Sequence, residues 1–461
     1  MTGFDPRAFK GRKAAVLGLG KSGLACAMLL AKKGFTVIGS DIRPSSELKE
    51  SLGRLPSKIS LAGGSHGRGL ARCGFAVKSP GIKPDAPALA DLRARGVPVF
   101  SEIEVALAFS KSDNVAAVTG TNGKTTTSVL LWSVFKKGLP TGKKALLCGN
   151  VGTPASDAAP GAKKGDWLVV EASSYQLEDS RRFCPKISVF LNVAPDHLDH
   201  HAGMDAYLRA KAKIFMEQSR ADFCVLNADD PAVVKLARPC RAQKLFFGLN
   251  PGPGLSAWTG RGKIWVKFGK SKAAPAALTP PKLPGEHNLQ NAMAAALAAR
   301  AAGLKLSAVA AAFKAFRGVE HRIEDAGTFK GIRCVNDSKA TNVDSTLMAL
   351  KSFPDAQSRL LLILGGRGKG SPYHPLRPLV EAKVKAILTI GEAAAKIESD
   401  LGDLRPLFPC GTLETAVKTA FQIGSPGDVL LLSPACASFD QFKDFEDRGR
   451  QFKDLTRRLG R

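Results

Sequence analysis

The stretch "NVAAVTGTNGKTTTSVLLW", from Asn114 to Trp132, decides the fold class of this chain of 461 residues. An apolar, β-branched run predicts a strand, glycines follow it, and a helical pattern begins at Lys124. Glycines let backbone N–H groups converge on phosphate oxygens, and a helix N-terminus adds partial positive charge. Lys124 can reach the β- and γ-phosphates, and Thr125 can offer its hydroxyl to Mg²⁺. The stretch therefore predicts a nucleoside triphosphate site in an α/β domain, although Val118 replaces the first glycine of the G-x-x-x-x-G-K-[ST] pattern.

Short aliphatic runs alternate with helical patterns along the rest of the chain, which is typical of α/β proteins with mainly parallel sheets. The length suggests about three domains, and we expect their bounds at 1–109, 110–317 and 318–461. The middle block contains a glycine- and proline-rich part, where a β-hairpin is expected around "KIWVKF", and an alanine-rich part, 288–316, that predicts helices. In the last block, "GIRCVND", "RLLLILGG", "VKAILTIG" and "DVLLLSPA" predict strands.

The composition is that of an ordinary globular protein, with 44% hydrophobic and 23% charged residues. We expect no signal peptide and no membrane insertion, because the aliphatic runs are too short. Nine cysteines without a C-x-x-C pair favour reduced thiols in a cytoplasmic protein. The formal net charge of +27 permits two interpretations, a nucleic-acid-binding surface or a solvated basic surface around clefts for phosphorylated substrates. The second is favoured, because lysines and arginines are spread without a long basic tract.

A second glycine-rich turn lies in "VLGLGKSGLACAMLLAKKGFTVIGSD", from Val16 to Asp41. Gly18, Gly20 and Gly23 form a G-x-G-x-x-G turn between a predicted strand and a predicted helix. Asp41 ends the next apolar run, where a ribose-binding acid is found in dinucleotide-binding domains. By itself, this pattern is typical of an NAD site.

Acidic and imidazole side chains follow two further predicted strands of the middle block. Glu171 in "DWLVVEASSYQLE" ends a strand, where its carboxylate can meet a phosphate-bound cation. In "NVAPDHLDHH", His197 and His201 have a spacing that suggests zinc, but no third soft ligand follows in a known pattern. Next to a phosphate-binding loop, Mg²⁺ held by phosphates, one carboxylate and one imidazole is favoured. We expect His200 and His201 to be solvated at the surface.

Several motifs together resemble one family. "GTNGKTT", "EASSYQLE", "NVAPDHLDHH", "YLRAKAKIF" and "GEHNLQNAMAA" occur in the order and context of the Mur ligases, which add amino acids to the peptide stem of the cell-wall precursor. The last block, with "NDSKATN", "LGGRGKG" and "LLSPACASFDQFKDFEDRG", is similar to the members that add D-glutamate to UDP-N-acetylmuramoyl-L-alanine. The resemblance covers essentially the whole chain.

The resemblance implies three α/β domains: an N-terminal Rossmann-like domain that binds the UDP-sugar, a central ATP-binding domain and a C-terminal Rossmann-like domain. It also implies that the first glycine turn holds UDP and not NAD, because a UDP diphosphate needs the same converging amides. The residues that the resemblance assigns to the UDP-sugar are Gly18, Gly20, Lys21, Ser22, Asp41, Arg43, Ser79, Gly81, Asn150 and Ser173.

For catalysis, the resemblance implies ATP as co-substrate, an acyl phosphate intermediate and two Mg²⁺ ions. Lys124, Glu171, His197 and Lys211 would be catalytic, and Thr125, Glu171, His197 and Lys211 would bind metal. Lys211 would be carbamylated, so that CO₂ turns a cation into an anionic ligand, whereas Lys213 points elsewhere on the helix. The ATP site would comprise Gly120, Thr121, Asn122, Gly123, Lys124, Thr125, Thr126, Asn288, Asn291, Arg322 and Asp337.

The resemblance assigns D-glutamate to Lys339, Thr341, Lys369, Ser438 and Phe445. Three alternatives stay open: another Mur-type ligase, an enzyme similar to folylpolyglutamate synthase, and a nucleic-acid-associated ATPase. Otherwise we expect a monomer in the cytoplasm that has no nucleic-acid partner.

Overall fold

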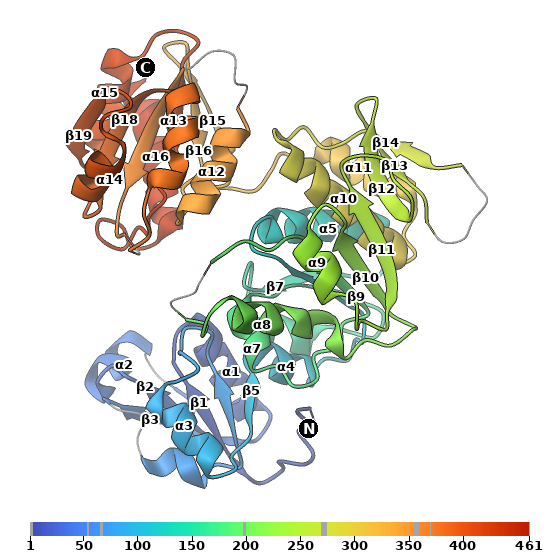
Figure 1. Ribbon diagram of the computed structural model, residues 1–461. Helices are drawn as coiled ribbons and strands as arrows, with labels where there is room; N and C mark the ends of the chain where they lie inside the picture. The colour runs from blue at the N-terminus through green and yellow to red at the C-terminus, as the bar shows by residue number, and fades with distance from the viewer. Residues whose placement is uncertain are drawn as a thin grey trace. The chain divides into compact units, whose positions relative to one another are not determined.

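The computed structural model describes residues 3–52, 55–64, 68–196, 200–268, 274–353, 359–368 and 370–460. The chain forms two compact units, each with its own sheets (Figure 1). The first unit comprises Met1–Lys282 and His287–Phe316, and the second comprises Leu283–Glu286 and Arg317–Arg461.

The sheet nearest the N-terminus has five parallel strands in the order β3-β2-β1-β4-β5. The chain order reverses between β1 and β4, so the carboxyl ends of these two strands adjoin at a topological switch point, where α/β sheets bind ligands. The strands are β1 (Lys13–Leu17), β2 (Thr36–Asp41), β3 (Ile59–Gly63), β4 (Phe75–Lys78) and β5 (Val99–Ser101). The helices are α1 (Lys21–Lys32), α2 (Ser45–Leu52), α3 (Pro87–Ala94) and α4 (Glu102–Leu107), with the 3-10 turn η1 (Arg68–Arg72).

The second sheet of this unit has nine strands in the order β14-β13-β12-β11-β10-β9-β6-β8-β7. β6 and β8 are buried along their whole length, as expected of parallel strands covered on both faces. β13 pairs antiparallel with β12 and β14, which confirms the hairpin predicted around "KIWVKF". The strands are β6 (Val115–Thr119), β7 (Ala145–Gly149), β8 (Trp167–Glu171), β9 (Ile187–Phe190), β10 (Phe223–Asn227), β11 (Gln243–Gly248), β12 (Leu255–Gly260), β13 (Lys263–Val266) and β14 (Ala276–Leu278).

Helices of the same unit surround this sheet. The alanine-rich part forms two helices, as predicted, and the alanines of the first are buried around its circumference. The helices are α5 (Lys124–Gly138), α6 (Ala155–Ala158), α7 (Ser174–Glu178), α8 (Met204–Met216), α9 (Pro231–Leu236), α10 (Glu286–Ala301) and α11 (Leu306–Ala315), with the 3-10 turn η2 (Ala159–Gly161).

The second unit has one sheet of six strands in the order β15-β16-β20-β17-β18-β19. Only β15 is antiparallel to its neighbour among these strands. The strands are β15 (Glu324–Phe329), β16 (Ile332–Asn336), β17 (Leu360–Gly365), β18 (Val384–Ile390), β19 (Leu407–Gly411) and β20 (Val429–Leu432). The helices are α12 (Val343–Lys351), α13 (Arg377–Lys383), α14 (Ala394–Leu401), α15 (Leu413–Ile423) and α16 (Phe445–Leu459), with the 3-10 turn η3 (His374–Leu376).

The predicted α/β class with mainly parallel sheets is confirmed, and so are the four strands predicted in the last block. All nine cysteines are free thiols. Within the described residues, none of the helices combines the length and the apolar character needed to cross a membrane.

Arg448 in α16 binds backbone carbonyls at or just after the ends of three neighbouring strands of the second unit. Its side chain is fully buried. The guanidinium donates to Ser338 O at 2.8 Å, to Cys436 O at 3.1 Å and to Gly365 O at 3.5 Å. Burial lowers the pKa of Arg448 to about 10, so the side chain still carries its charge at neutral pH. The guanidinium therefore fixes the carboxyl edge of β16, β17 and β20.

Replacing Arg448 with methionine should leave these buried carbonyl groups without a donor. We expect the free energy of opening of β16, β17 and β20 to fall by about 3 kcal/mol, measured by hydrogen exchange and peptide-resolved mass spectrometry. Arg457→Met is the matched control, because Arg457 lies on the same helix with a side chain that is 55% exposed. Equal protection of the three strands in both variants would contradict the role of Arg448.

Candidate nucleotide and ligation site

The predicted phosphate-binding loop, Gly120–Thr125, lies at the carboxyl edge of the nine-stranded sheet. β6 runs into the loop, and its two neighbours, β8 and β9, end beside it. Because parallel neighbours end at the same edge, the loop, Glu171 and the segment after β9 share one site. Gly120 and Gly123 have φ angles of 152° and 82°, conformations that favour glycine. The strand, loop and helix predicted from the sequence are confirmed.

The loop packs against α10 through Asn291. A Cβ atom at Gly123 would lie 2.3 Å from Asn291 Oδ1. Asn291 accepts a hydrogen bond from Thr127 Oγ1 at 3.1 Å and donates to Asn288 Oδ1 at 3.2 Å. Both asparagines are buried. The structure therefore brings these two predicted ATP-site residues against the first turn of α5.

Two residues that the sequence analysis did not single out hold the loop. Asn192 Oδ1 accepts the N–H groups of Thr121 at 3.1 Å and Asn122 at 2.8 Å. The buried hydroxyl of Tyr207 on α8 lies 2.9 Å from Thr121 Oγ1. Asn192 therefore occupies the N–H groups of the two residues that follow Gly120. In the sequence, Asn192 could have been noticed because it follows a predicted strand. Tyr207 could have been noticed because it lies one helical turn before Lys211.

Lys124 and Lys211 donate to the same backbone carbonyl. Lys124 Nζ lies 2.9 Å from Gly120 O and 2.7 Å from Thr121 O. Lys211 Nζ lies 2.7 Å from Gly120 O and 4.6 Å from the centre of the Tyr207 ring. Helix α8 thus places Lys211 directly beneath the phosphate-binding loop.

Lys211 is 1% exposed and is not an ordinary surface lysine. Burial and the charge of Lys124 lower the pKa of Lys211 well below its ordinary value, against the opposing influence of Asp196 and Glu171. A lower pKa increases the fraction of neutral, nucleophilic amine. Lys213 points elsewhere, as expected, and donates to the backbone carbonyl of Glu178.

Glu171 presents a buried carboxylate oxygen suited to a cation. Its side chain is buried, and Oε1 accepts a hydrogen bond from Asn150 Nδ2 at 2.7 Å. Oε2 has no hydrogen-bond partner within the described part of the chain. A lone buried carboxylate oxygen is costly, and a hard cation is a partner that would satisfy it. Together with Thr125, which is buried at the start of α5, Glu171 fits a Mg²⁺ ion at the phosphates of ATP.

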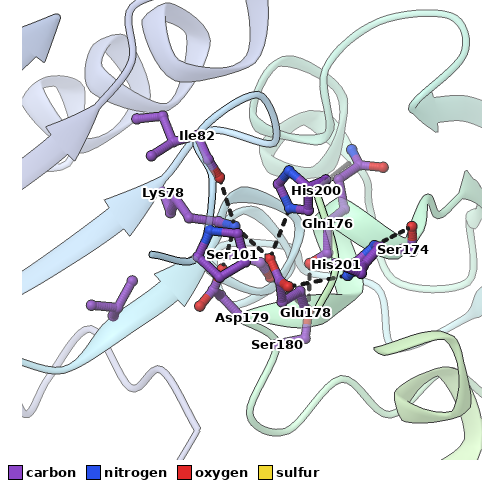
Figure 2. A network of polar contacts seen from close by, with 12 residues as sticks. Lys78, Ile82, Ser101, Ser174, Gln176, Glu178, Asp179, Ser180, His200 and His201 are labelled. Atoms are coloured by element: carbon purple, nitrogen blue, oxygen red, sulfur yellow. Dashed lines mark hydrogen bonds and ion pairs between the residues drawn. The ribbon is translucent and has the colours of Figure 1, made fainter. Parts of the chain in front are cut away.

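The histidine-rich segment differs from the expectation. His197 lies outside the described residues, so its metal role stays a prediction. The expectation that His200 and His201 are solvated is wrong, because both are buried. His200 Nε2 lies 3.1 Å from Glu178 Oε2, and His201 Nδ1 lies 3.3 Å from Glu178 Oε1 (Figure 2). This carboxylate lies 22 residues before His200, so the local sequence gave no sign of it.

In the N-terminal sheet, the glycine turn after β1 meets the loop after β4. Ser79 Oγ donates to Gly18 O at 2.7 Å, which joins the two loops at the switch point. Gly18 has a φ of 80°, and a Cβ atom at Gly23 would lie 1.8 Å from Gly18 O, so both positions require glycine. Gly20 directly precedes α1, and Gly81 lies in the turn after Ser79.

Asp41 and Arg43 form an ion pair beside this turn. Asp41 Oδ1 accepts a hydrogen bond from Arg43 Nε at 3.1 Å, and Oδ2 accepts the N–H of Leu19 at 2.8 Å. Burial alone would raise the pKa of Asp41, but these hydrogen bonds outweigh it and lower the pKa to about 2. The charged Asp41 therefore anchors the glycine turn, while Ser22 lies in the first turn of α1.

The loop after β7 contacts α1 of the N-terminal part and β8 of the nine-stranded sheet. Lys21 at the start of α1 donates to Gly152 O at 3.2 Å. Asn150 of the same loop holds Glu171, and Ser173 caps α7 two residues after Glu171. The UDP-sugar candidates Asn150 and Ser173 thus lie beside the candidate metal ligand.

In the second unit, Asp337 is buried just after β16. It accepts the N–H of Ile323 at 3.2 Å and the Ser433 hydroxyl at 2.8 Å. Burial raises the pKa of Asp337 to about 7, although the hydroxyl of Ser433 and the charge of Arg322 oppose this. Arg322 Nε is buried and has no hydrogen-bond partner among the described residues.

The candidates for D-glutamate binding also lie at the carboxyl edge of this sheet. Lys339 Nζ lies 5.2 Å from the centre of the Phe445 ring. Thr341 N donates to Lys339 O at 2.9 Å, and Ser438 is buried after the neighbouring strand β20. Lys369 lies outside the described residues, and its role stays a prediction.

Family models match the chain in three consecutive parts. The N-terminal domain of the Mur ligase MurD-like family matches 12–101, the Mur ligase middle domain matches 118–299, and the Mur ligase glutamate ligase domain matches 321–436.

Relatives match along nearly the whole chain. A UDP-N-acetylmuramoylalanine--D-glutamate ligase from Elusimicrobium minutum is 45% identical over 99% of this chain and 100% of its own length. A ligase of the same name from Anaeromyxobacter dehalogenans is 42% identical over 97% of this chain and 98% of its own.

Solved structures share the fold. A pseudomurein peptide ligase type C from Methanothermus fervidus has a TM-score of 0.60 at 19% identity, with 97% of this chain and 100% of that chain covered. The MurF ligase from Thermotoga maritima in complex with ADP has a TM-score of 0.60 at 17% identity, with 97% and 96% covered. The family models and the relatives that match along nearly the whole chain confirm the resemblance in the sequence motifs. The chain belongs to the Mur ligase family.

Proposed function

We propose that the chain is an ATP-dependent ligase that joins D-glutamate to UDP-N-acetylmuramoyl-L-alanine in the synthesis of peptidoglycan precursors. The observation that carries this proposal is the edge of the nine-stranded sheet, where the phosphate-binding loop, Glu171 and the buried amine of Lys211 meet. The two relatives at 45% and 42% identity bear the name of this ligase, which supports the choice of substrates.

The reaction joins a carboxylate to an amine. The L-alanyl carboxylate attacks the γ-phosphorus of ATP, which gives an acyl phosphate and ADP. The amine of D-glutamate then attacks the acyl carbonyl and loses a proton, and the tetrahedral intermediate expels phosphate. Because two anions meet in the first step, the protein must neutralise charge more than it must supply a nucleophile.

Different residues of the first unit would bind the ATP phosphates and the metal ions. Lys124 and the N-terminus of α5 would bind the ATP phosphates. Thr125, Glu171, His197 and a carbamylated Lys211 would hold two Mg²⁺ ions. When bound, these ions would neutralise charge between the γ-phosphate and the attacking carboxylate.

The other assignments follow the same proposal, with domains at 1–109, 110–317 and 318–461. UDP would bind at the switch point between β1 and β4, where an NAD-like pattern stands. D-glutamate would bind the residues at the carboxyl edge of β16 and β20, and Arg322 and Asp337 would serve the nucleotide. We expect a cytoplasmic monomer that needs neither NAD nor a nucleic acid.

Phosphate release tests the function directly. The enzyme should release phosphate from ATP with UDP-N-acetylmuramoyl-L-alanine and D-glutamate together, and not with either alone. In a panel of D- and L-amino acids, only D-glutamate should support phosphate release. Hydrolysis that is stimulated by DNA or RNA and falls steeply with salt would instead support a nucleic-acid-associated ATPase.

Lys124→Ala should lower kcat by about a hundredfold or more, because the ammonium serves the ATP phosphates. Binding of the UDP-sugar should be largely unchanged, since its proposed contacts lie mainly in the other sheet. Calorimetry with the UDP-sugar alone and steady-state phosphate release measure the two effects separately. A variant that keeps more than about a tenth of the wild-type kcat would refute the phosphate role.

Lys211→Ala should be nearly inactive, because the proposed carbamate supplies a metal ligand. The neutral amine forms an N–C bond to CO₂ and gives up a proton, which the lowered pKa of Lys211 favours. Short-chain carboxylic acids should partly rescue the variant by filling the vacant ligand position. NMR of native enzyme with ¹³C-bicarbonate should show a carbamate signal that Lys211→Ala lacks.

Lys213→Ala is the internal control for this test, because Lys213 lies on the same helix and contacts a different carbonyl. It should keep the carbamate signal and should need no carboxylic acid. Full activity of Lys211→Ala, or a carbamate signal independent of Lys211, would contradict the carbamate and leave Lys211 with a structural role alone.

A further inference from the structure

A buried ion cluster joins the two sheets of the first unit. Lys78 ends β4 of the N-terminal sheet, and its side chain is 1% exposed. Its ammonium lies 2.8 Å from Glu178 Oε2 and 2.8 Å from Asp179 Oδ2, at the end of α7 (Figure 2). It also donates to Ile82 O at 3.1 Å. The Lys78 ammonium therefore binds two carboxylates at the end of α7 and one carbonyl of the loop after β4.

The carbonyl contact closes the loop that lines the proposed UDP-sugar site. The loop turns between Ser79 and Ile82, with Ile82 N donating to Ser79 O at 3.2 Å. Ser79 in turn donates to Gly18 O in the glycine turn. The position of Ser79 and Gly81 therefore depends on where the Lys78 ammonium is held.

Glu178 contacts the histidine segment with the same carboxylate. Its two oxygens lie 3.1 Å from His200 Nε2 and 3.3 Å from His201 Nδ1. His201 Nε2 lies 3.0 Å from Ser174 Oγ, in the first turn of α7. Burial lowers the pKa of His201, although the charge of Glu178 opposes this. Lys78 is the cation that the N-terminal sheet presents to this carboxylate.

A metal ion is the competing interpretation of this cluster. The ligand atoms of Glu178, His200 and His201 lie within 4.8 Å of one another. The Lys78 ammonium, however, already lies against Glu178 Oε2 and would repel a second cation there. The contacts therefore favour a salt-bridged junction.

This junction connects three segments that serve different parts of the proposed reaction. Lys78 leads into the UDP-sugar loop, and α7 starts at Ser174, directly after Ser173 and three residues after Glu171. The segment from His200 leads into α8, which carries Lys211. Removing one partner of a buried ion pair is strongly unfavourable, so the three segments hold one another in register.

We propose that Glu178 is a positioning residue of the ligation, whose carboxylate couples the UDP-sugar loop to the segments that bind ATP and metal. This inference rests on the proposed function, since it assigns UDP-sugar and ATP to those two places. Its consequence is reciprocal: each ligand should tighten binding of the other through the Lys78–Glu178 pair.

Calorimetry on the full-length enzyme tests this coupling. We measure the Kd of UDP-N-acetylmuramoyl-L-alanine with and without a non-hydrolysable ATP analogue and Mg²⁺. In the wild type, the analogue should tighten UDP-sugar binding about tenfold. Glu178→Gln and Lys78→Met should each lower the ratio of the two Kd values to about one. The double variant should show the same loss of coupling as either single variant.

Two controls separate coupling from general damage. Arg95→Ala removes an exposed ion pair with Asp91 of the same domain and should leave the enhancement intact. The double variant replaces Lys78 and Glu178 together, so neither is left as the unpaired partner of the other, while Asp179 keeps its ion pair with Arg93 at 3.1 Å. Thermal unfolding of every variant confirms the folded state.

The outcomes are distinct. A wild type that binds neither UDP nor the UDP-sugar would refute the proposed function itself. A wild type without enhancement, or folded variants that keep it while only their thermal stability falls, would overturn the coupling and leave Glu178 a structural residue.

Discussion

Gly123 approaches Asn291 so closely that any side chain at this position would collide with it, and the central site depends on this approach. An added Cβ atom would lie 2.3 Å from Asn291 Oδ1. The next residue, Lys124, begins α5, and Thr127 one turn later donates back to Asn291. The start of α5 and helix α10 therefore fix each other, although Thr127 and Asn291 are 164 residues apart in the sequence. On the other side, Asn192 holds the loop N–H groups, so the conformation of the loop is set by its surroundings.

Buried cations bind backbone carbonyls in both units, as Lys211 does at Gly120 O in the first. Arg448 binds carbonyls after three strands of the second unit. Lys383 donates to Leu350 O at 3.1 Å and Phe353 O at 2.8 Å. A carbonyl has two lone pairs and no charge of its own, so it satisfies a donor without fixing a counter-ion. Carboxylates recur where segments of different sheets must be joined, as at Lys78.

The sequence predicted the parts of this architecture that depend on local patterns. Continuous apolar runs identified the buried strands, and the loop motif identified its own strand and helix. Strand β19 contains Pro409 and is largely half-exposed at a sheet edge, so no apolar run marked it. The burial of His200 and His201 was not predictable, because it depends on Glu178 and, through it, on Lys78, 100 residues before that glutamate. Contacts at such separations leave no periodic signal.

Gly120 O accepts hydrogen bonds from both Lys124 and Lys211, but the surroundings of the two amines differ. Lys124 has a second acceptor in Thr121 O, whereas Lys211 is buried and lies near the ring of Tyr207. Burial and, after it, the like charge of Lys124 lower the pKa of Lys211 well below its ordinary value. Conversion of that amine to a carbamate would replace the repulsion by attraction between an anion and Lys124. Gly120 O would still keep one donor. The charge of Lys124, which disfavours Lys211 as a cation, would therefore favour it as a carbamate anion.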